Sequence, residues 1–392
     1  MFYPRKLLPQ LKKQIKSREI IVLTGMRRTG KTTLFKMIFD GINSAHKVFL
    51  DMENPIEQKV FEEADYNNII FNLSVMGINP KKKMYIFLDE VQAMPSAIKA
   101  VKYLYDHYDI KFFLTGSSSF YLKNLFPESL AGRKFIFEIF PLDFEEFLLF
   151  KNKEKKFHLL FNQKDNAKNK IGYEKVKKYY DEYLQFGGFP GVVLADNKND
   201  KKLRLNDIFK SYFEKDVRVL ADFKEINAFR DLILLLMQRV GSKMEISKIA
   251  SEIGVSRETV YSFFAFLEAT YFVSFIRPFS TNVDREVSGS KKVYLCDNGL
   301  LNHFAQVSEG SLFENSVFIN LKKYGKINYY QKRSGVEIDF IVNKIALEVK
   351  MHGTDFDLKK LKKVALALGL KKYYLLTKSF NKKEKFIPAV EL

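Results

Sequence analysis

The chain has 392 residues, of which 46% are hydrophobic, so it is long enough for two or three folded domains. Its 65 Lys and Arg outnumber its 46 Asp and Glu. The resulting net charge of +19 favours polyanions such as nucleic acid but is also compatible with a solvated lysine surface. The single cysteine, Cys296, excludes an internal disulfide framework and a multi-cysteine zinc site, and the five His form no metal-binding pair.

Residues 4–17 are expected to form a basic helix. The strands expected after it cover 20–24, 47–50, 84–88, 110–115 and 134–139, with helices at 34–39, within 55–78 and at 96–107. This alternation predicts a parallel sheet covered on both faces.

The segment between the first strand and its helix fits a phosphate-binding loop. Gly25 and Gly30 are separated by four residues, and Lys31 and Thr32 follow. Backbone N–H groups and the helix N-terminus then converge on phosphates. Lys31 is expected to reach the β- and γ-phosphates of ATP, and the Thr32 hydroxyl is expected to bind Mg²⁺. The residues assigned to ATP binding are Gly25, Met26, Arg27, Arg28, Thr29, Gly30, Lys31, Thr32 and Thr33, and the direction of the two arginines is left open.

Acidic and hydroxyl residues end two later strands. Asp89 and Glu90 follow the third strand, where an Asp can hold Mg²⁺ and an adjacent acid can orient the attacking water. Ser117 follows the fourth strand and is either a hydroxyl near the γ-phosphate or part of a helix cap. Arg133 precedes the fifth strand and either neutralises transition-state charge or is a surface arginine.

The middle of the chain is predicted to be mostly helical. Residues 151–172 read as a surface connection, helices dominate 173–270, and 187–191 form a sharp turn. The segment 245–270 has a helix-turn-helix rhythm, with Ser256 capping the second helix. That helix either contacts DNA or belongs to a structural linker, because its expected exposed face is hardly basic.

A hairpin near the C-terminus gathers charged residues. Strands at 336–342 and 345–350, joined by a two-residue turn, place Asp339 opposite Glu348 and Glu337 opposite Lys350. Two facing carboxylates about 5 Å apart at Cβ repel each other. They therefore require a compensating charge, either a bound Mg²⁺ or Lys350.

No apolar run is long enough for a membrane span; the longest, at 232–237, reads as a buried helix segment. The N-terminus runs straight into the first strand, unlike a signal peptide. We therefore expect a soluble cytoplasmic protein without a membrane partner.

Five motifs, at 25–32, 87–92, 114–118, 130–133 and 187–190, resemble a family of prokaryotic, especially archaeal, AAA+ ATPases with a winged-helix segment and a restriction-endonuclease-like C-terminal domain. The resemblance spans nearly the whole chain. It implies that Glu90 is the catalytic base, Ser117 the sensor and Arg133 a finger acting on a neighbouring subunit of a homo-oligomer. No lid arginine can be placed.

The hairpin resembles the active site of restriction-endonuclease-like nucleases. That resemblance implies that Asp339 and Glu348 hold Mg²⁺, that Lys350 stabilises charge at the attacking water, and that Glu314, on a helix, is the family's additional acid. The alternative is a polar hairpin face held by a Glu337–Lys350 pair.

The sequence thus predicts an α/β protein with an N-terminal phosphate-loop, parallel-sheet ATPase domain (1–170), a helical connector (171–240), a winged-helix segment (241–285) and a nuclease-like α/β domain (286–392). The predicted function is Mg²⁺-dependent ATP hydrolysis driving a conformational change, with DNA as a candidate partner. The alternatives are a nucleotide-gated switch with slow hydrolysis and an ATP-regulated DNA endonuclease.

Overall fold

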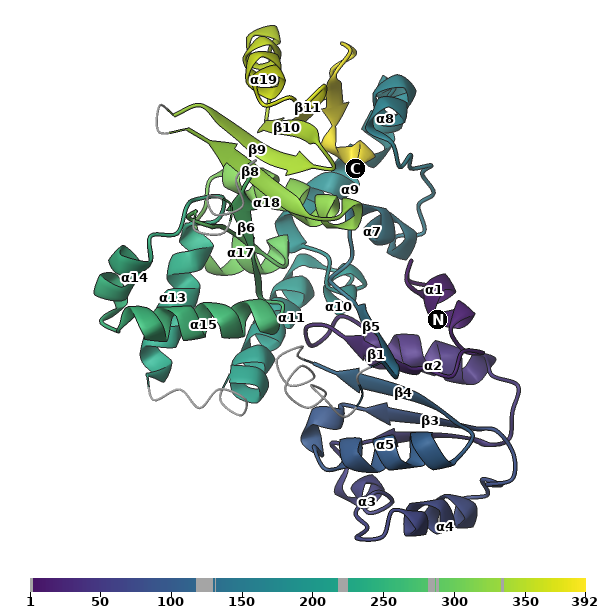
Figure 1. Ribbon diagram of the computed structural model, residues 1–392. Coiled ribbons are helices and arrows are strands. Elements are labelled where there is room, and N and C mark those ends of the chain that lie inside the picture. The colour runs from purple at the N-terminus through teal and green to yellow at the C-terminus, as the bar shows by residue number, and fades with distance from the viewer. Residues whose placement is uncertain are drawn as a thin grey trace. The chain divides into compact units, whose positions relative to one another are not determined.

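The chain folds into two compact units, each with its own sheet (Figure 1). The computed structural model describes residues 3–117, 130, 132–217, 225–280, 286, 289–332 and 335–392. The first unit comprises Met1–Phe140 with Ala269–Tyr271, and the second comprises Pro141–Glu268 with Phe272–Leu392. Each unit is described by itself.

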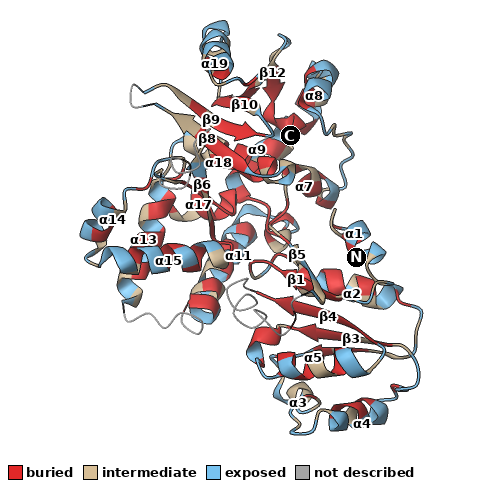
Figure 2. Cartoon of the chain, viewed as in Figure 1, coloured by how far each residue is buried: buried red, intermediate tan, exposed pale blue. Residues whose placement is uncertain are grey.

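The first unit is built on a five-stranded parallel sheet of order β2-β3-β4-β1-β5. Its strands are β1 (Ile20–Thr24), β2 (Lys47–Asp51), β3 (Met84–Asp89), β4 (Ile110–Gly116) and β5 (Lys134–Glu138). The central strands β1 and β4 are buried along their whole length, as expected for apolar strands covered on both faces (Figure 2). The predicted parallel sheet is confirmed.

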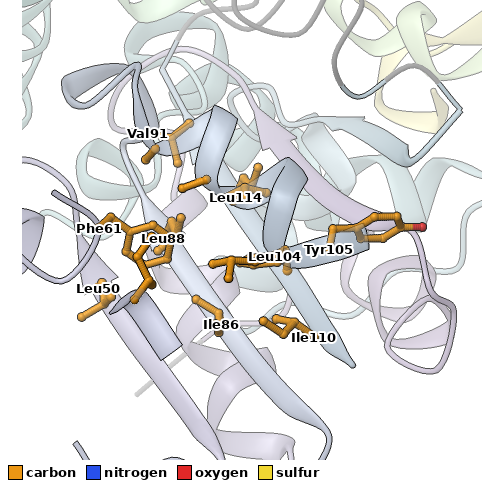
Figure 3. Packing of buried hydrophobic residues seen from close by; sticks show 14 of the residues in the cluster. Leu50, Phe61, Ile86, Leu88, Val91, Leu104, Tyr105, Ile110 and Leu114 are labelled. Atoms are coloured by element: carbon orange, nitrogen blue, oxygen red, sulfur yellow. The ribbon is translucent and has the colours of Figure 1, made fainter. Parts of the chain in front are cut away.

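Helices pack on both faces of this sheet. They are α1 (Leu8–Lys13), α2 (Lys31–Gly41), α3 (Pro55–Gln58), α4 (Asn67–Val75) and α5 (Ala97–His107), with a 3-10 turn at Val91–Ala93. Phe35 of α2 packs edge-on against Phe87 and Phe113 on one face. On the other face, Leu104 of α5 joins Ile86 in the core (Figure 3). The helix expected over 4–17 is shorter, because only Leu8 and Leu11 give α1 a buried face.

The second unit contains a seven-stranded mixed sheet of order β12-β11-β10-β9-β8-β6-β7. Its strands are β6 (Val273–Pro278), β7 (Lys292–Leu295), β8 (Ile327–Gln331), β9 (Glu337–Val342), β10 (Ile345–Lys350), β11 (Lys372–Thr377) and β12 (Phe386–Pro388). Its helices are α7 (Phe144–Phe150), α8 (Phe161–Ala167), α9 (Lys170–Phe186), α10 (Pro190–Val193), α11 (Lys198–Ser211), α13 (Ile226–Gln238), α14 (Ile246–Ile253), α15 (Arg257–Ala269), α17 (Asn298–Phe304), α18 (Glu309–Leu321) and α19 (Asp355–Ala367). Shorter helical turns cover Tyr212–Val217, Lys322–Tyr324 and Ala389–Glu391.

Part of the segment expected to be a surface connection is structured. Helix α8 buries Phe161 and Lys164, and Lys168 donates to the carbonyl of Phe386 at 2.7 Å. The expectation of a surface connection over 151–172 is therefore wrong at α8. The polar composition of α8 did not predict these contacts, because their partners lie more than 200 positions away in the chain.

The strands after α15 join the C-terminal sheet. β6 pairs antiparallel with β7 and parallel with β8, and Lys243 forms a further bridge to Lys292. At the start of α15, the Ser256 hydroxyl accepts from Thr259 N at 3.1 Å, as predicted for its cap. The two units divide at 140/141, so α7 and α8 belong to the second unit. The four-part division stays a prediction.

The turn at 187–191 is organised by a buried carboxylate. Asp297 caps α17 and accepts from Leu300 N at 3.1 Å and from Gly188 N at 2.6 Å. Gly187 has φ 73°, and a Cβ there would lie 2.1 Å from an Asp297 carboxylate oxygen. Burial raises the pKa of Asp297 to about 6, against the lowering effect of these hydrogen bonds. The turn therefore needs glycine because a carboxylate occupies the side-chain space.

Among the described helices, none combines the length and apolarity needed to cross a membrane.

Candidate functional site

The phosphate loop connects β1 to α2. Gly30 caps α2 with φ 94°, in the left-handed region that favours glycine. The buried Lys31 ammonium donates to the carbonyls of Gly25 at 3.0 Å and Met26 at 3.2 Å. It also lies 4.0 Å from a carboxylate oxygen of Glu90. The buried Lys31 ammonium therefore lies at the centre of the loop, beside Glu90, which directly follows β3.

Asp89, the last residue of β3, is contacted by residues of α2 and β4. The Thr32 hydroxyl donates to Asp89 Oδ2 at 2.7 Å, and the Thr115 hydroxyl donates to Asp89 Oδ1. Burial raises the pKa of the Asp89 carboxyl, and the two hydroxyl bonds partly oppose that shift. β4 lies between β1 and β3 in the sheet, so it supplies Thr115 to this network. A hydroxyl and a carboxylate are oxygen donors suited to Mg²⁺.

Glu90 and Ser117 come together through Gln92. The Gln92 amide donates to Glu90 Oε2 and to Ser117 Oγ, the latter at 3.1 Å. The backbone N–H of Glu90 donates to the Thr115 hydroxyl at 2.9 Å. Glu90 has φ 51°, an uncommon conformation for a residue other than glycine, and such strain is concentrated at functional sites. Residue 118, also part of the predicted hydroxyl motif, lies outside the described residues.

Arg133 does not join this group. Its carbonyl accepts from the N–H of Ile20 at 2.8 Å, at the start of β1, whereas the loop follows the end of β1. Five strand residues separate the two by about 13 Å along the strand. The guanidinium instead pairs with Asp106 at 3.0 Å. Arg133 therefore lies where β1 begins, at the end of the sheet opposite to the loop of its own chain.

The two loop arginines differ. Arg27 forms an ion pair with Glu53 at 3.2 Å. Arg28 adopts φ 66°, a left-handed conformation inside the loop. Arg27 is therefore directed toward a carboxylate of its own unit.

A second cluster of charges lies on the hairpin of the second unit. Val342 pairs with Ile345 and Phe340 with Leu347, so the predicted hairpin register is confirmed. The turn residues Asn343 and Lys344 have φ 49° and 62°. Continuing this register places Asp339 opposite Glu348.

Two residues of β7 complete this cluster. Tyr294 donates to Glu314 Oε1 at 2.6 Å, and Lys292 forms an ion pair with Glu337. Lys350 pairs with Glu348 at 2.9 Å. The alternative of a Glu337–Lys350 pair is therefore wrong, because β7 supplies a different lysine to Glu337.

The carboxylates of the cluster are buried close to one another. Burial, with the charge of Asp339 added, raises the pKa of Glu314 and of Glu348 to about 7. Burial also raises the pKa of Asp339, against the nearby charge of Lys292. Burial alone would lower the pKa of Lys292, but the surrounding carboxylates outweigh it and the pKa is raised. The site therefore concentrates negative charge in a desolvated environment.

The donor set suits a hard cation. Glu348 Oε2 is buried and has no hydrogen-bond partner among the described residues. Asp339 Oδ2 accepts from Val349 N at 2.7 Å. In the described part of the chain, no three His, Cys, Asp or Glu side chains are grouped as a metal would need. Mg²⁺, however, binds through one or two carboxylates and keeps several waters, so Asp339 and Glu348 fit it.

Five contributing residues lay outside the predicted sites: Gln92, Thr115, Lys292, Tyr294 and Arg5, whose side chain reaches the loop. Only the first two carried a sequence signal, since they lie within the motifs at 87–92 and 114–118.

Residues 17–148 match a family described as "AAA domain", and residues 177–311 match a domain of unknown function, DUF8612. The chain is 31% identical over 338 residues to the uncharacterized protein MJ1544 of Methanocaldococcus jannaschii, across 83% of this chain and 72% of that protein. The chain belongs to this family of AAA-domain proteins. An AAA domain typically binds ATP with Mg²⁺, which agrees with the loop and with Asp89.

Other similar proteins extend over comparable lengths. An uncharacterized protein of Haemophilus influenzae is 29% identical over 346 residues, across 84% of this chain and 81% of that protein. The solved structure of the ADP form of the Aeropyrum pernix ORC2 protein aligns at 13% identity with a TM-score of 0.35, across 82% of this chain and 95% of that one. The A. pernix ORC1 protein in complex with DNA aligns at 12% identity with a TM-score of 0.34, across 80% and 93%. At these TM-scores, neither structure assigns an activity or a partner to the AAA-domain chain.

Proposed function

We propose that the first unit is a Mg²⁺-dependent ATPase whose turnover drives a conformational change. The observation that carries the proposal is the network in which Thr32 and Thr115 both donate to Asp89, beside Lys31 and Glu90. Lys31 exchanges loop carbonyls for phosphate oxygens when ATP binds. Mg²⁺ held by Thr32 and Asp89 would neutralise charge on the phosphates.

Glu90 is the proposed general base. Its position at the carboxyl end of β3 lets its carboxylate orient a water toward the γ-phosphate. Gln92 links it to Ser117, which fits a role for Ser117 in sensing the γ-phosphate. The test is ATP binding and phosphate release by Lys31→Ala. Wild-type binding and turnover in that variant would contradict the proposal.

The rival is a nucleotide-gated switch that hydrolyses ATP slowly. It is favoured by the contacts of Glu90, whose carboxylate accepts a hydrogen bond from Gln92 and lies 4.0 Å from the Lys31 ammonium. A switch would show tight binding and little turnover, and Glu90→Gln would change little.

Arg133 is proposed to act on a neighbouring subunit. Its place at the far edge of the sheet puts the loop of its own chain out of reach. Catalysis by Arg133 therefore requires a homo-oligomer. Sedimentation of the chain with and without ATP tests for one.

For the second unit, we propose Mg²⁺-dependent cleavage of nucleic acid at Asp339, Glu348 and Lys350, with Glu314 as a supporting acid. The orphaned Glu348 Oε2 and the nearby Lys350 support this reading. Plasmid cutting with Mg²⁺ or Mn²⁺ that disappears in Asp339→Ala would support it. Absence of cutting in every nucleotide state would reduce the unit to a binding module.

A lysine-rich surface supports a nucleic-acid partner for this unit. Residues 358–383 contain nine lysines and no acidic residue. Seven of them are exposed and have no ion pair among the described residues: Lys359, Lys360, Lys362, Lys363, Lys371, Lys372 and Lys382. We call these seven the lysine face. Such a surface binds phosphate backbones by releasing counterions.

The lysine face adjoins the carboxylate cluster. Glu348 and Leu375 share a register position, so their side chains lie on one face of the sheet, and Leu375 packs with Leu361 of α19. At the start of α19, burial would raise the pKa of Asp357, but hydrogen bonds from Thr354 and, to a smaller extent, the charges of Lys350 and Lys360 lower it, so both lysines lie near this carboxylate. The four lysines of α19 lie within five consecutive residues, 359–363, and therefore cover about 6 Å of the helix axis.

The segment 241–285 is proposed to be a winged helix. Helices α14 and α15 followed by the β6–β7 pair support that topology. Exposed residues of α15 include Arg257, Glu258, Tyr261 and Ser262, a mixed set with little positive charge. The lysine face is therefore the better candidate for phosphate contact.

A further inference from the structure

Arg5 is a buried arginine close to the start of the chain, and it contacts two distant backbone segments. One guanidinium nitrogen donates to the carbonyl of Thr29 at 2.8 Å, and the other donates to the carbonyl of Phe140 at 2.8 Å. Only 8% of its surface is exposed. A planar, permanently charged fork suits this task, because each carbonyl receives its own guanidinium nitrogen and the two nitrogens have a fixed geometry.

The first of these bonds acts on the phosphate loop. The carbonyl of Thr29 and the N–H of Gly30 belong to one rigid, planar peptide group and point in opposite directions. Fixing that carbonyl therefore fixes the direction of the Gly30 N–H, one of the loop donors at the start of α2. A phosphate that accepts from this N–H in turn polarises the carbonyl and strengthens its bond to Arg5.

The second bond acts on the junction where the chain leaves the first unit. The carbonyl of Phe140 belongs to the peptide bond with Pro141, which is where the second unit begins. Just before it, Ile139 N donates to the carbonyl of Thr24 at 2.8 Å, so the end of β5 is held against the end of β1. The fork of Arg5 thus links the loop peptide to the junction peptide.

The chain returns to the same place at 269–271. Tyr271 donates to Glu138 at 2.9 Å, and its ring packs edge-on against Phe140 with centroids 5.6 Å apart. Tyr271 has φ 63°, an unfavourable conformation for an aromatic residue that surrounding contacts must maintain. Helix α15 ends at Ala269, two residues before Tyr271, and β6 begins at Val273, two residues after it.

We infer that Arg5 is a positioning residue for the phosphate loop and that it couples nucleotide binding to the segment 269–271, which joins α15 to β6. The inference rests on the proposed ATP binding at this loop and adds the route by which the loop acts on the rest of the chain. It predicts that nucleotide binding orders Tyr271, and that this response passes through the two carbonyls held by Arg5.

The test uses the full-length chain with Mg²⁺ and a non-hydrolysable imido analogue of ATP. We measure the dissociation constant of the analogue and the hydrogen exchange of peptides spanning 268–273. In the wild type, the analogue slows exchange in these peptides. In Arg5→Lys, the analogue binds about tenfold more weakly, and the slowing at 268–273 is lost even when the protein is saturated.

The matched control is Arg18→Lys. Arg18 also donates to a backbone carbonyl, that of Tyr105 at 3.5 Å, and it lies over the ring of Tyr105. It precedes β1 and so belongs to the edge of the sheet away from the loop. This variant keeps wild-type affinity and the exchange response. A purely structural role for Arg5 would lower the melting temperature without changing either readout on the folded protein.

Two further measurements test the inference if Arg5→Lys folds poorly. Tyr271→Phe removes only the hydroxyl that reaches Glu138, so it keeps the affinity for the analogue and weakens the response at 268–273. Free guanidinium ion partly restores the affinity of Arg5→Ala.

Unchanged affinity and an unchanged exchange response in Arg5→Lys would overturn the inference. So would a wild type that binds the analogue without any change at 268–273, and in that case the proposed ATPase function would stand. A wild type that binds no nucleotide would overturn the proposed function and this inference together.

Discussion

The hydroxyl of Thr32 donates to Oδ2 of Asp89 across 2.7 Å, although 57 positions separate the two residues in the chain. The contact joins the first turn of α2 to the end of β3, and Thr115 of β4 closes the network from the other side. Three separate sequence motifs therefore meet around one buried carboxylate.

Asp89→Asn should lower the ATPase activity without lowering the stability of the fold. The burial that raises the pKa of Asp89 also makes its charge costly in the free protein, so the variant should unfold at the same temperature as wild type or higher. ATP turnover at 1 mM Mg²⁺ should fall by about 10²–10³-fold, since a cation ligand is lost. Thermal unfolding and phosphate release measure the two effects. Wild-type turnover would exclude Asp89 from the site.

Asp339→Asn should stabilise the second unit while weakening its cation site. Removing one of the mutually repelling buried charges should raise the free energy of unfolding by about 1–2 kcal/mol at pH 7. Calorimetric titration with Mn²⁺ should show at least tenfold weaker binding. Glu384→Gln, a change on an exposed side chain, is the control and should alter neither value. Lower stability together with unchanged Mn²⁺ binding would contradict the proposal that Asp339 belongs to a cation site.

The lysine face should dominate binding to duplex DNA. Replacing Lys359, Lys360, Lys362 and Lys363 together by Gln should reduce the slope of log affinity against log salt by about 2–4. The matched control replaces four exposed lysines of α9, a helix that also carries three acidic residues: Lys170, Lys175, Lys177 and Lys178.

Fluorescence anisotropy of a random-sequence duplex, in Ca²⁺ to prevent cutting, measures both variants. If the lysine-face variant and the α9 control lost the same affinity for DNA, binding would depend on net charge alone. Loss of binding to phosphatidylserine vesicles, with DNA binding retained, would assign the lysine face to a membrane surface instead.

Asp297 should make the stability of the second unit depend on pH. Burial raises its pKa from the ordinary 3.8 to about 6 in the folded chain, so the folded state binds the proton more tightly. The stabilisation from that proton is complete below about pH 3.8 and is lost as the pH rises through about 6. Relative to wild type, Asp297→Asn should therefore gain up to about 3 kcal/mol of unfolding free energy between pH 4 and pH 7.

Denaturant unfolding at four pH values measures this difference. Because Asn offers one acceptor oxygen where Asp offers two, the variant should be the less stable protein at pH 4. A difference between the two proteins that is constant with pH would mean that Asp297 is ionised equally in both states.

Local patterns predicted the parts of the molecule that depend on neighbours in sequence. The strand before Gly25, the helix after Lys31 and the hairpin register around Asn343 follow from composition and spacing over a few residues. The hairpin register was enough to predict that Asp339 lies opposite Glu348, because side chains alternate between the two faces of a strand.

Long-range contacts were not predictable in this way. Lys292 reaches Glu337 only because β6 and β7 join the C-terminal sheet, and that pairing leaves no mark in the sequence around either residue. Arg5 lies 135 positions from Phe140. Helix α8 was missed because its sequence is mostly polar, and the residues that cover it lie at the other end of the chain.

Glu90 is proposed to activate water for ATP hydrolysis at the loop. The most direct test is single-turnover hydrolysis of radiolabelled ATP by Glu90→Gln, with the affinity for ATP measured on the same preparation. ATP affinity within about threefold of wild type and a hydrolysis rate at least 10²-fold lower would agree with the account. Hydrolysis at the wild-type rate would contradict it and would leave the loop as the ATP-binding site of a slow switch.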